Sequence, residues 1–374
     1  MAVAAIITGT GLYTPTSSIS NDELVTSYNT WAQKENDKHQ QAIAAGEKDP
    51  LPLSNSAFIE KASGIKSRYV MDREGVLDPG RMVPRLPERD NEEISVQCEM
   101  ALHAARDALS QARVRPEEID LVIVACSNLQ RAYPAIAVEV QYYLGASGYA
   151  YDMNVACSSA TFGIKAATDA ILSGNAQRVL VISPEITSAH LNFRDRDSHF
   201  IFGDASTAVV VEAESVASNE KGFEILGTRA WTQFSNNIRN NFGFLNRADE
   251  SGIGQPDKLF VQNGRKVFKE VCPKVAEIIS SHLDELRLTS EKLSRLWLHQ
   301  ANLSMNQLIS RRVLGREATP AEAPVILDEY ANTSSAGSII AFHKYSADLE
   351  AGSCGVICSF GAGYSIGSIV VRKR

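Results

Sequence analysis

Three residues of this 374-residue sequence lie in surroundings that could support nucleophilic chemistry: Cys157, His299 and Asn332. Cys157 lies in the stretch NVACSSATFG, whose small residues let the backbone bend sharply with little bulk around the sulfur. The pattern of residues 151–174 predicts a strand, a tight turn and an amphipathic helix. A cysteine at a helix start faces unpaired N–H groups and the positive end of the helix dipole, so we expect a thiolate.

Each of these residues alone also has an ordinary structural explanation. A single cysteine is more often buried and inert, a histidine often belongs to a core, and an asparagine often forms a turn. All three are nevertheless expected at strand ends, where α/β folds bind their ligands. His299 ends the apolar stretch LWLHQAN, and Asn332 lies in YANTSSAG. A thiol, an imidazole and a carboxamide are therefore predicted to converge on one pocket.

The second half of the sequence repeats the order of the first. Residues 117–129 match residues 291–303 in pattern, and the Ser-Ser-Ala of residues 158–160 recurs at residues 334–336. These matches keep one order and nearly one offset, which predicts two equivalent α/β halves.

The expected halves divide the three residues between them. Residues 1–215 form an N-terminal half with Cys157, and residues 216–374 form a C-terminal half with His299 and Asn332. The first half is longer than the second because it contains a polar, proline-containing stretch at about 33–90, which we expect to be an insertion. Its first part, to about residue 62, is expected to be a surface excursion over the core.

Local signals place the surrounding elements. Ser20 and Glu23 have capping-box spacing, which predicts a helix from there to about residue 45. Apolar periodicity predicts another helix over residues 92–112. The continuously apolar LVIVAC predicts a strand covered on both faces. In FIFGDASTAVVVEAE, Gly203 is expected to mark the turn of a hairpin-like pair.

Composition restricts the class of protein. Hydrophobic residues make up 44% of the sequence and charged residues 22%, which are globular values. The net charge of -7 argues against nucleic acid as the main partner. Six cysteines without a CxxC pair suggest reduced thiols and a cytoplasmic location. The start reads as a strand, not a signal peptide, and no apolar run is long enough to cross a bilayer, so we expect a soluble protein without a membrane partner.

The glycine-rich stretch FGAGYSIGS, at residues 360–368, is a candidate nucleotide-binding loop. Its third glycine, Gly367, comes one residue late for G-x-G-x-x-G. Too few residues follow it for a βαβ unit, so nucleotide binding is not favoured.

Four motifs in order resemble the β-ketoacyl-ACP synthase III family of the thiolase superfamily. They are NVACSSATFG with Cys157, HQANL with His299, ANTSSAG with Asn332, and FGAGYSIGS. The resemblance covers nearly the whole chain, including IITGTGLYTP, GIKSR, FGDAS and NGRKVFKEV. It implies a five-layered αβαβα sandwich made of two duplicated halves, and a homodimer.

The resemblance also implies the reaction and makes Cys157, His299 and Asn332 its catalytic residues. Cys157 would take an acyl group from an acyl-CoA. Malonyl-ACP would then lose CO2, and its enolate would attack the acyl-cysteine. A thiolate suits the first step because thioester exchange is nearly thermoneutral. His299 and Asn332 can both donate hydrogen bonds to the oxygen of the forming enolate. No carboxylate is needed at the centre, and neither a metal nor another cofactor is expected.

Substrate-binding residues follow from matched family positions. The resemblance implies that Phe58 and Arg196 contact CoA, although the family often has tryptophan at the first position. It implies that Tyr133 reaches into the acyl tunnel of a partner subunit. Ala362 would supply a backbone N–H to an oxyanion hole, with Phe360 close to it in the glycine-rich stretch.

A basic pair, Arg311 and Arg312, is the candidate docking site for acyl carrier protein. A solvated helix face is the alternative interpretation of this pair. The docking arginine that the family has five residues after the histidine is Ser304 here.

Other functions stay open at this point. An acyltransferase with another acceptor, or a synthase that joins two acyl thioesters or uses a non-malonyl partner, would need the same residues. Cysteine proteases also use Cys, His and Asn, but the C-G-S-C type of signature is absent near the start. A non-enzymatic scaffold would not need all three residues. The acyl chain length does not follow from the sequence.

Overall fold

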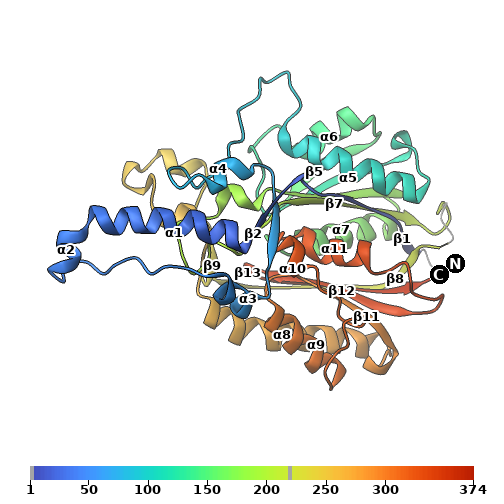
Figure 1. Ribbon diagram of the computed structural model, residues 1–374. Helices are drawn as coiled ribbons and strands as arrows, with labels where there is room; N and C mark the ends of the chain where they lie inside the picture. Colours follow the sequence, from blue (N-terminus) through green and yellow to red (C-terminus); the bar gives the residue numbers. More distant parts are fainter. Residues whose placement is uncertain (1–3, 218–220) are drawn as a thin grey trace.

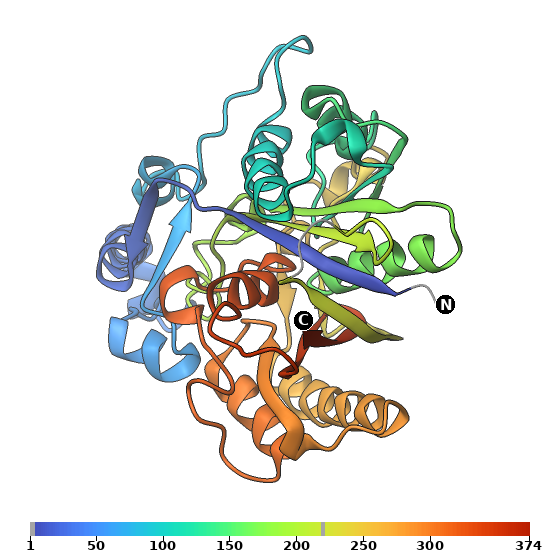
Figure 2. The same ribbon diagram turned by 90° about the vertical axis from the view of Figure 1, so that its right-hand side faces the viewer.

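The computed structural model describes residues 4–217 and 221–374, and it has five layers that alternate between helices and sheets. Figures 1 and 2 show helices on both outer faces and further helices between the sheets. The outer pairs are α5 (Val96–Ala112) with α6 (Ile136–Leu144), and α8 (Gly264–Glu285) with α9 (Leu303–Leu314); the central pair is α7 (Ser159–Leu172) and α11 (Ala336–Lys344). This arrangement confirms the predicted αβαβα sandwich.

In the described part of the chain, nine strands are hydrogen-bonded in the order β11-β12-β13-β8-β1-β7-β6-β4-β5. The sheet divides between β1 and β8, whose described residues share only the pairs Ile6–Glu224 and Ile7–Phe223. The first part contains β1 (Ala5–Tyr13), β4 (Leu121–Ala125), β5 (Tyr149–Met153), β6 (Arg178–Glu185) and β7 (Ala205–Ala213). The second contains β8 (Phe223–Ser235), β11 (Leu293–Leu298), β12 (Cys354–Gly361) and β13 (Gly363–Lys373).

The two parts repeat one topology. The order β4-β6-β7-β1 corresponds to β11-β12-β13-β8. The first pair is parallel in both parts, and the next two pairs are antiparallel in both. The duplication expected from the sequence is therefore present in the fold. The boundary at residues 215 and 216 stays a prediction.

The central helices are apolar and rich in small residues, which lets both sheets approach them. Ala160, Ile164 and Ala167 of α7 belong to the same buried cluster as Ile339 and Phe342 of α11. Full burial of an isoleucine or phenylalanine stabilises the fold by roughly 1.5–3 kcal/mol. Because Cys157 lies two residues before α7, this packing also fixes where the sulfur lies.

Most local predictions agree with the structure. α1 (Asn21–Lys38) has the expected capping box at Ser20, and α2 (Gln40–Ala44) continues it after a break at His39. α5 begins at Val96, four residues later than predicted, because the Ser95 hydroxyl caps it by accepting from the Cys98 N–H. β4 is buried at every residue, as expected.

The hairpin expected at Gly203 is wrong. The segment between β6 and β7 contains a short 3-10 helix, Thr187–His190, followed by turns. A Cβ on Gly203 would lie 2.4 Å from the Tyr330 carbonyl oxygen. Glycine is needed there because two backbones approach closely, not because the chain turns back.

Residues 33–90 contain the end of α1 followed by α2, α3 (Ser56–Ser63), β3 (Ser67–Val70), α4 (Arg73–Leu77) and connecting segments. β3 pairs with β2 (Ser17–Ser20), while α1 and α2 extend from the body of the molecule in Figure 1. Ile59, Val70 and Met82 are buried in a cluster with Phe200 and Phe202. The segment is thus part of a local core beside the strand ends as well as a surface excursion.

Candidate active site

Cys157 lies in the turn between β5 and α7, as the sequence predicts. The turn needs a positive φ of 47° at Ala156 and is braced by the Ser159 hydroxyl, which accepts from the Val155 N–H at 2.8 Å. Gly361, at the end of β12, closes over the cysteine. A Cβ on Gly361 would lie 2.6 Å from Cys157 Cβ and 3.0 Å from Sγ. Two loops from opposite halves of the fold therefore meet at the sulfur.

The three predicted residues line one cavity of about 610 Å³. Cys157, His299 and Asn332 come from the ends of different elements, and most of the remaining lining is apolar. Its aromatic members are Phe58, Phe200, Phe202, Phe260, Phe268 and Phe360. A nucleophile and two polar side chains thus face a space suited to an apolar ligand.

Asn332 is held in one orientation. It follows the short helix α10 (Leu327–Tyr330) and forms an isolated bridge with Phe202, so the expected strand end is absent at this position. Its Oδ1 accepts from the Ser334 N–H at 2.9 Å. Only the oxygen of a carboxamide can accept, so this bond fixes the amide and directs its NH2 group elsewhere. The side chain can then donate to an oxygen atom in the cavity.

His299 follows β11 directly, and its backbone N–H donates to Cys358 at 2.8 Å. The ring is buried and lies edge to face against Phe360, with 5.2 Å between the ring centroids. Burial lowers the pKa of His299 to about 4, and a backbone hydrogen bond at Ser334 only partly opposes this. At neutral pH the imidazole is uncharged, so it carries one N–H donor and one acceptor nitrogen.

The expected Cys157 thiolate is wrong for the resting protein. Burial raises the pKa of the thiol to about 11. The Ser334 hydroxyl, 3.5 Å from the sulfur, and backbone hydrogen bonds at Ala362 and Cys157 lower the pKa less than burial raises it. Desolvation depends on the packed tertiary structure, which a helix-start pattern does not contain.

Two further polar residues that act on the Cys157 thiol were not predicted as site residues from the sequence. Ser334, part of the repeated Ser-Ser-Ala, donates its hydroxyl to Cys157 Sγ and has a positive φ of 51°. Glu185, at the end of β6, is a buried carboxylate whose charge raises the pKa of Cys157.

Phe58 lines the cavity, and Arg196 lies against its ring. The Arg196 guanidinium is 4.2 Å from the centroid of the Phe58 ring, and its Nε donates to the Leu53 carbonyl at 2.8 Å. Phe360 lines the same cavity. Ala362 directs its backbone toward Cys157 in the hydrogen bond that lowers the thiol pKa. Contact of these residues with a substrate stays a prediction.

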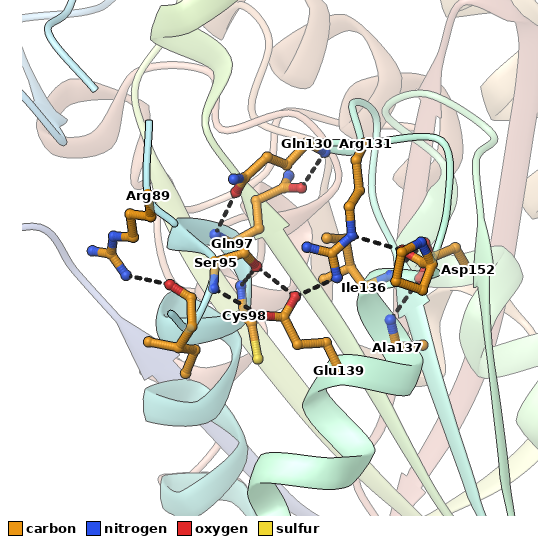
Figure 3. A network of polar contacts seen from close by, with 12 residues as sticks. Arg89, Ser95, Gln97, Cys98, Gln130, Arg131, Ile136, Ala137, Glu139 and Asp152 are labelled. Carbon is orange, nitrogen blue, oxygen red and sulfur yellow. Dashed lines mark hydrogen bonds and ion pairs between the residues drawn. The ribbon is translucent and has the colours of Figure 1, made fainter. Parts of the chain in front are cut away.

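Tyr133 lies outside the cavity and is 86% exposed. The loop before it is nevertheless well held (Figure 3). Arg131 forms an ion pair of 2.6 Å with Glu139 and donates from Nε to the Pro134 carbonyl, and Glu139 in turn accepts from Ser95. A tyrosine presented on a braced loop suits a contact outside this chain, which stays a prediction.

Arg311 and Arg312 are exposed on α9. Arg311 forms an ion pair with Glu317 at 3.1 Å, so part of its charge is already neutralised. Within residues 4–217 and 221–374, no group of three or more His, Cys, Asp or Glu side chains is arranged to hold a metal ion. The same part of the chain has no helix long and apolar enough to cross a membrane.

Comparison with known proteins agrees with this site. Two family models match, 3-oxoacyl-[acyl-carrier-protein (ACP)] synthase III over residues 151–233 and its C-terminal domain over residues 283–373. A Pseudomonas aeruginosa protein named beta-ketodecanoyl-[acyl-carrier-protein] synthase is 66% identical over 348 residues, or 93% of this chain and 99% of that protein.

More distant relatives cover the whole fold. Beta-ketoacyl-[acyl-carrier-protein] synthase III of Granulibacter bethesdensis is 28% identical, covering 98% of this chain and 99% of that protein. The crystal structure of 3-oxoacyl-[acyl-carrier-protein] synthase III from Aquifex aeolicus has a TM-score of 0.75 and 26% identity, covering 98% of this chain and 99% of that one. The chain therefore belongs to the 3-oxoacyl-[acyl-carrier-protein] synthase III family and is an acyl-transferring condensing enzyme of fatty-acid biosynthesis.

Proposed function

We propose that this enzyme condenses an acyl-CoA primer with malonyl-ACP, through an acyl group carried on Cys157, and releases CO2 and a 3-oxoacyl-ACP. The observation that supports this most directly is the cavity shared by Cys157, His299 and Asn332. These three side chains supply the nucleophile and the hydrogen-bond donors that the two half-reactions need. Most of the other residues that line the cavity are apolar, which suits an acyl chain.

The first half-reaction transfers the acyl group. Cys157 Sγ loses its proton and attacks the thioester carbonyl, the new S–C bond forms, and the bond to the CoA sulfur breaks. The CoA thiolate then takes up a proton. Uncharged His299 has an acceptor nitrogen for the thiol proton, and the backbone donors at Cys157 and Ala362 stabilise the oxyanion. Because the thiol pKa is about 11, this deprotonation contributes to the barrier.

The second half-reaction forms the carbon–carbon bond. The C–C bond to the malonyl carboxylate breaks and CO2 leaves, while the electron pair forms an enolate on the thioester oxygen. The NH2 group of Asn332 and the N–H of His299 donate to that oxygen. The enolate carbon attacks the acyl carbonyl, and Cys157 Sγ leaves as a thiolate that is reprotonated.

We further propose a primer of eight carbons. The Pseudomonas aeruginosa relative is named for a ten-carbon 3-oxoacyl product, and decarboxylative condensation adds two carbons. Each buried CH2 group contributes about 0.8 kcal/mol, so six more of them favour octanoyl over acetyl by up to about 5 kcal/mol. Phe200, Phe202 and Phe260 in the cavity wall support a preference for an apolar chain.

We also propose a homodimer in the cytoplasm. β5 lies at the end of the sheet order, and an open strand edge with exposed aromatic side chains is typical of a surface that pairs. Tyr133, Tyr142 and Tyr149 are exposed along this side. All six cysteines are free thiols, which fits a reducing compartment. Arg311 and Arg312 are the proposed docking residues for the acidic carrier protein.

Intact-protein mass spectrometry with acyl-CoAs from acetyl to dodecanoyl tests this proposal. We expect one acyl adduct, greatest with octanoyl-CoA, and none on Cys157→Ser with unchanged circular dichroism. An undiminished adduct on that variant would show that another residue is acylated. Product analysis separates the related functions: a 3-oxoacyl thioester with CO2 supports condensation, whereas a transferred ester or a free acid contradicts it.

A further inference from the structure

Glu185 is a fully buried carboxylate that joins the two halves of the fold. Its Oε1 accepts from the backbone N–H of Ser127 at 3.0 Å and of Ser335 at 3.2 Å. The hydroxyl groups of the same two serines also donate to the carboxylate, that of Ser127 at 2.6 Å. One side chain therefore fastens two separate backbone segments.

Those segments are the end of β4 and the start of α11. Ser127 comes two residues after β4 in the first half, and Ser335 is the N-cap residue of α11 in the second. Ser334, next to Ser335, donates its hydroxyl to Cys157 Sγ and its N–H to Asn332 Oδ1. Glu185 therefore holds Ser335, and the adjacent Ser334 contacts both Cys157 and Asn332.

Neither stability nor thiol activation accounts for this carboxylate. A buried charge is costly unless it is compensated, and the recorded partners of Glu185 in the described residues are serines and the Cys126 thiol, not a lysine or arginine. Its charge also raises the pKa of Cys157, which opposes nucleophile formation. The four N–H and O–H donors of Ser127 and Ser335, which converge on two oxygen atoms, are in contrast well suited to fix geometry.

We propose that Glu185 is a positioning residue that clamps the Asn332–Ser335 turn against the end of β4. The clamp keeps the Asn332 amide and the Ser334 hydroxyl directed at the cavity during condensation. This inference rests on the proposed roles of Cys157 and Asn332.

Single-turnover assays of the two half-reactions test the clamp. Glu185→Ala removes every acceptor, and we expect condensation to fall about 100-fold, as for a misplacement of about 1 Å, with acylation nearly retained. Glu185→Gln keeps an oxygen for the two backbone N–H groups and is expected to recover most of that loss. Equal loss in both variants, or no loss in Glu185→Ala, would overturn the proposal.

A serine pair keeps the test decisive if Glu185→Ala does not fold. Ser335→Ala and Ser127→Ala each remove one hydroxyl from the same carboxylate, but only Ser335 continues into the Asn332 turn. We expect Ser335→Ala to slow condensation severalfold more than Ser127→Ala. Equal effects would mean that Glu185 serves packing in general. Asn332→Ala in the same assay distinguishes failure of the proposed function from failure of the clamp. Normal condensation by Asn332→Ala would contradict the proposed function. Slow condensation by Asn332→Ala together with normal condensation by the Glu185 and Ser335 variants would contradict the clamp alone.

The pH dependence of Cys157 alkylation gives an independent test, because a purely structural role of Glu185 would leave that pH profile unchanged. Glu185→Gln removes the negative charge near the sulfur, so the alkylation profile is expected to shift to lower pH. The neighbouring ionisable groups are Cys126, whose pKa is raised by burial and by Glu185, and Asp152, which acts on Cys126. Glu212→Gln is the matched control, because Glu212 is also fully buried but pairs with Arg178. An unchanged profile in Glu185→Gln, or the same shift in Glu212→Gln, would contradict the placement of this charge beside the nucleophile.

Discussion

Replacing Gly361 with alanine is expected to displace the nucleophile without altering the chemistry of any side chain. The added Cβ would lie 2.6 Å from Cys157 Cβ, whereas ordinary van der Waals contact begins at 3.4 Å. The two backbones must therefore separate by about 0.8 Å, the difference between these distances. Neither side yields easily, because Gly361 pairs with Ser365 in the sheet and Cys157 lies in the turn that leads directly into the buried helix α7.

The expected magnitude follows from that displacement. A misplacement of about 1 Å at a reacting centre costs about 100-fold in rate, so we expect Gly361→Ala to slow acylation by about 10- to 100-fold. Overpacking of this kind also destabilises a fold by about 1–3 kcal/mol. The assay is the single-turnover rate of acyl transfer from octanoyl-CoA to the protein, with thermal unfolding measured in parallel.

Gly243→Ala is the matched control. Gly243 has an extended φ of -178°, and no atom lies within 4 Å of a Cβ added there. This variant should acylate at the wild-type rate and unfold at the wild-type temperature. Wild-type acylation by Gly361→Ala would refute the close approach of β12 to Cys157, and with it the account of how the site is assembled.

Two other predictions concern surface charge and acid stability. Arg311→Glu combined with Arg312→Glu should raise KM for malonyl-ACP and leave the CoA half-reaction nearly unchanged, because approach to an acidic carrier depends on a local basic patch; equal loss in both half-reactions would indicate a structural role. Stability should fall as pH drops below 6.5, because burial lowers the pKa of four histidines to about 3 or 4, so the unfolded chain binds protons that the folded one does not. These are His190, His199, His282 and His299. Each contributes about 1.4 kcal/mol per pH unit. Asp204, whose pKa burial raises to about 6, offsets one of them between about pH 4 and 6. Urea unfolding at pH 7 and pH 5 measures the change, and equal midpoints would contradict the burial of the histidines.

The sequence was most informative where a local pattern or a repeat determines structure. The small residues around Cys157 predicted the tight turn, the apolar stripe after it predicted the helix, and the repeated order of elements predicted the duplicated halves. The sequence was less informative where tertiary packing decides. Glu185 gives no local signal, because its partners Ser127 and Ser335 lie in different halves of the chain. The state of Cys157 was mispredicted for the same reason, since desolvation by surrounding elements outweighs the helix start.

Helix boundaries show the same limit on a smaller scale. The apolar pattern before α5 suggested an earlier start, but the Ser95 hydroxyl fixes the first turn at Val96. The sequence indicates a turn at Gly203. In the structure, a side chain at this position would collide with the backbone of Tyr330, which lies on a distant segment of the chain. Such contacts become visible only when the chain is folded.

The central claim is that Cys157 carries the acyl group while His299 and Asn332 stabilise the enolate. Single-turnover rates of acylation and of condensation in Asn332→Ala and His299→Ala test it most directly. Removal of one preorganised donor to a developing oxyanion typically costs about 100- to 1000-fold, or about 3–4 kcal/mol. We predict that both variants accept the acyl group but lose condensation by about that factor, with His299→Ala also acylating more slowly because His299 is the proposed acceptor of the thiol proton. Condensation at the wild-type rate in Asn332→Ala would contradict the three-residue site.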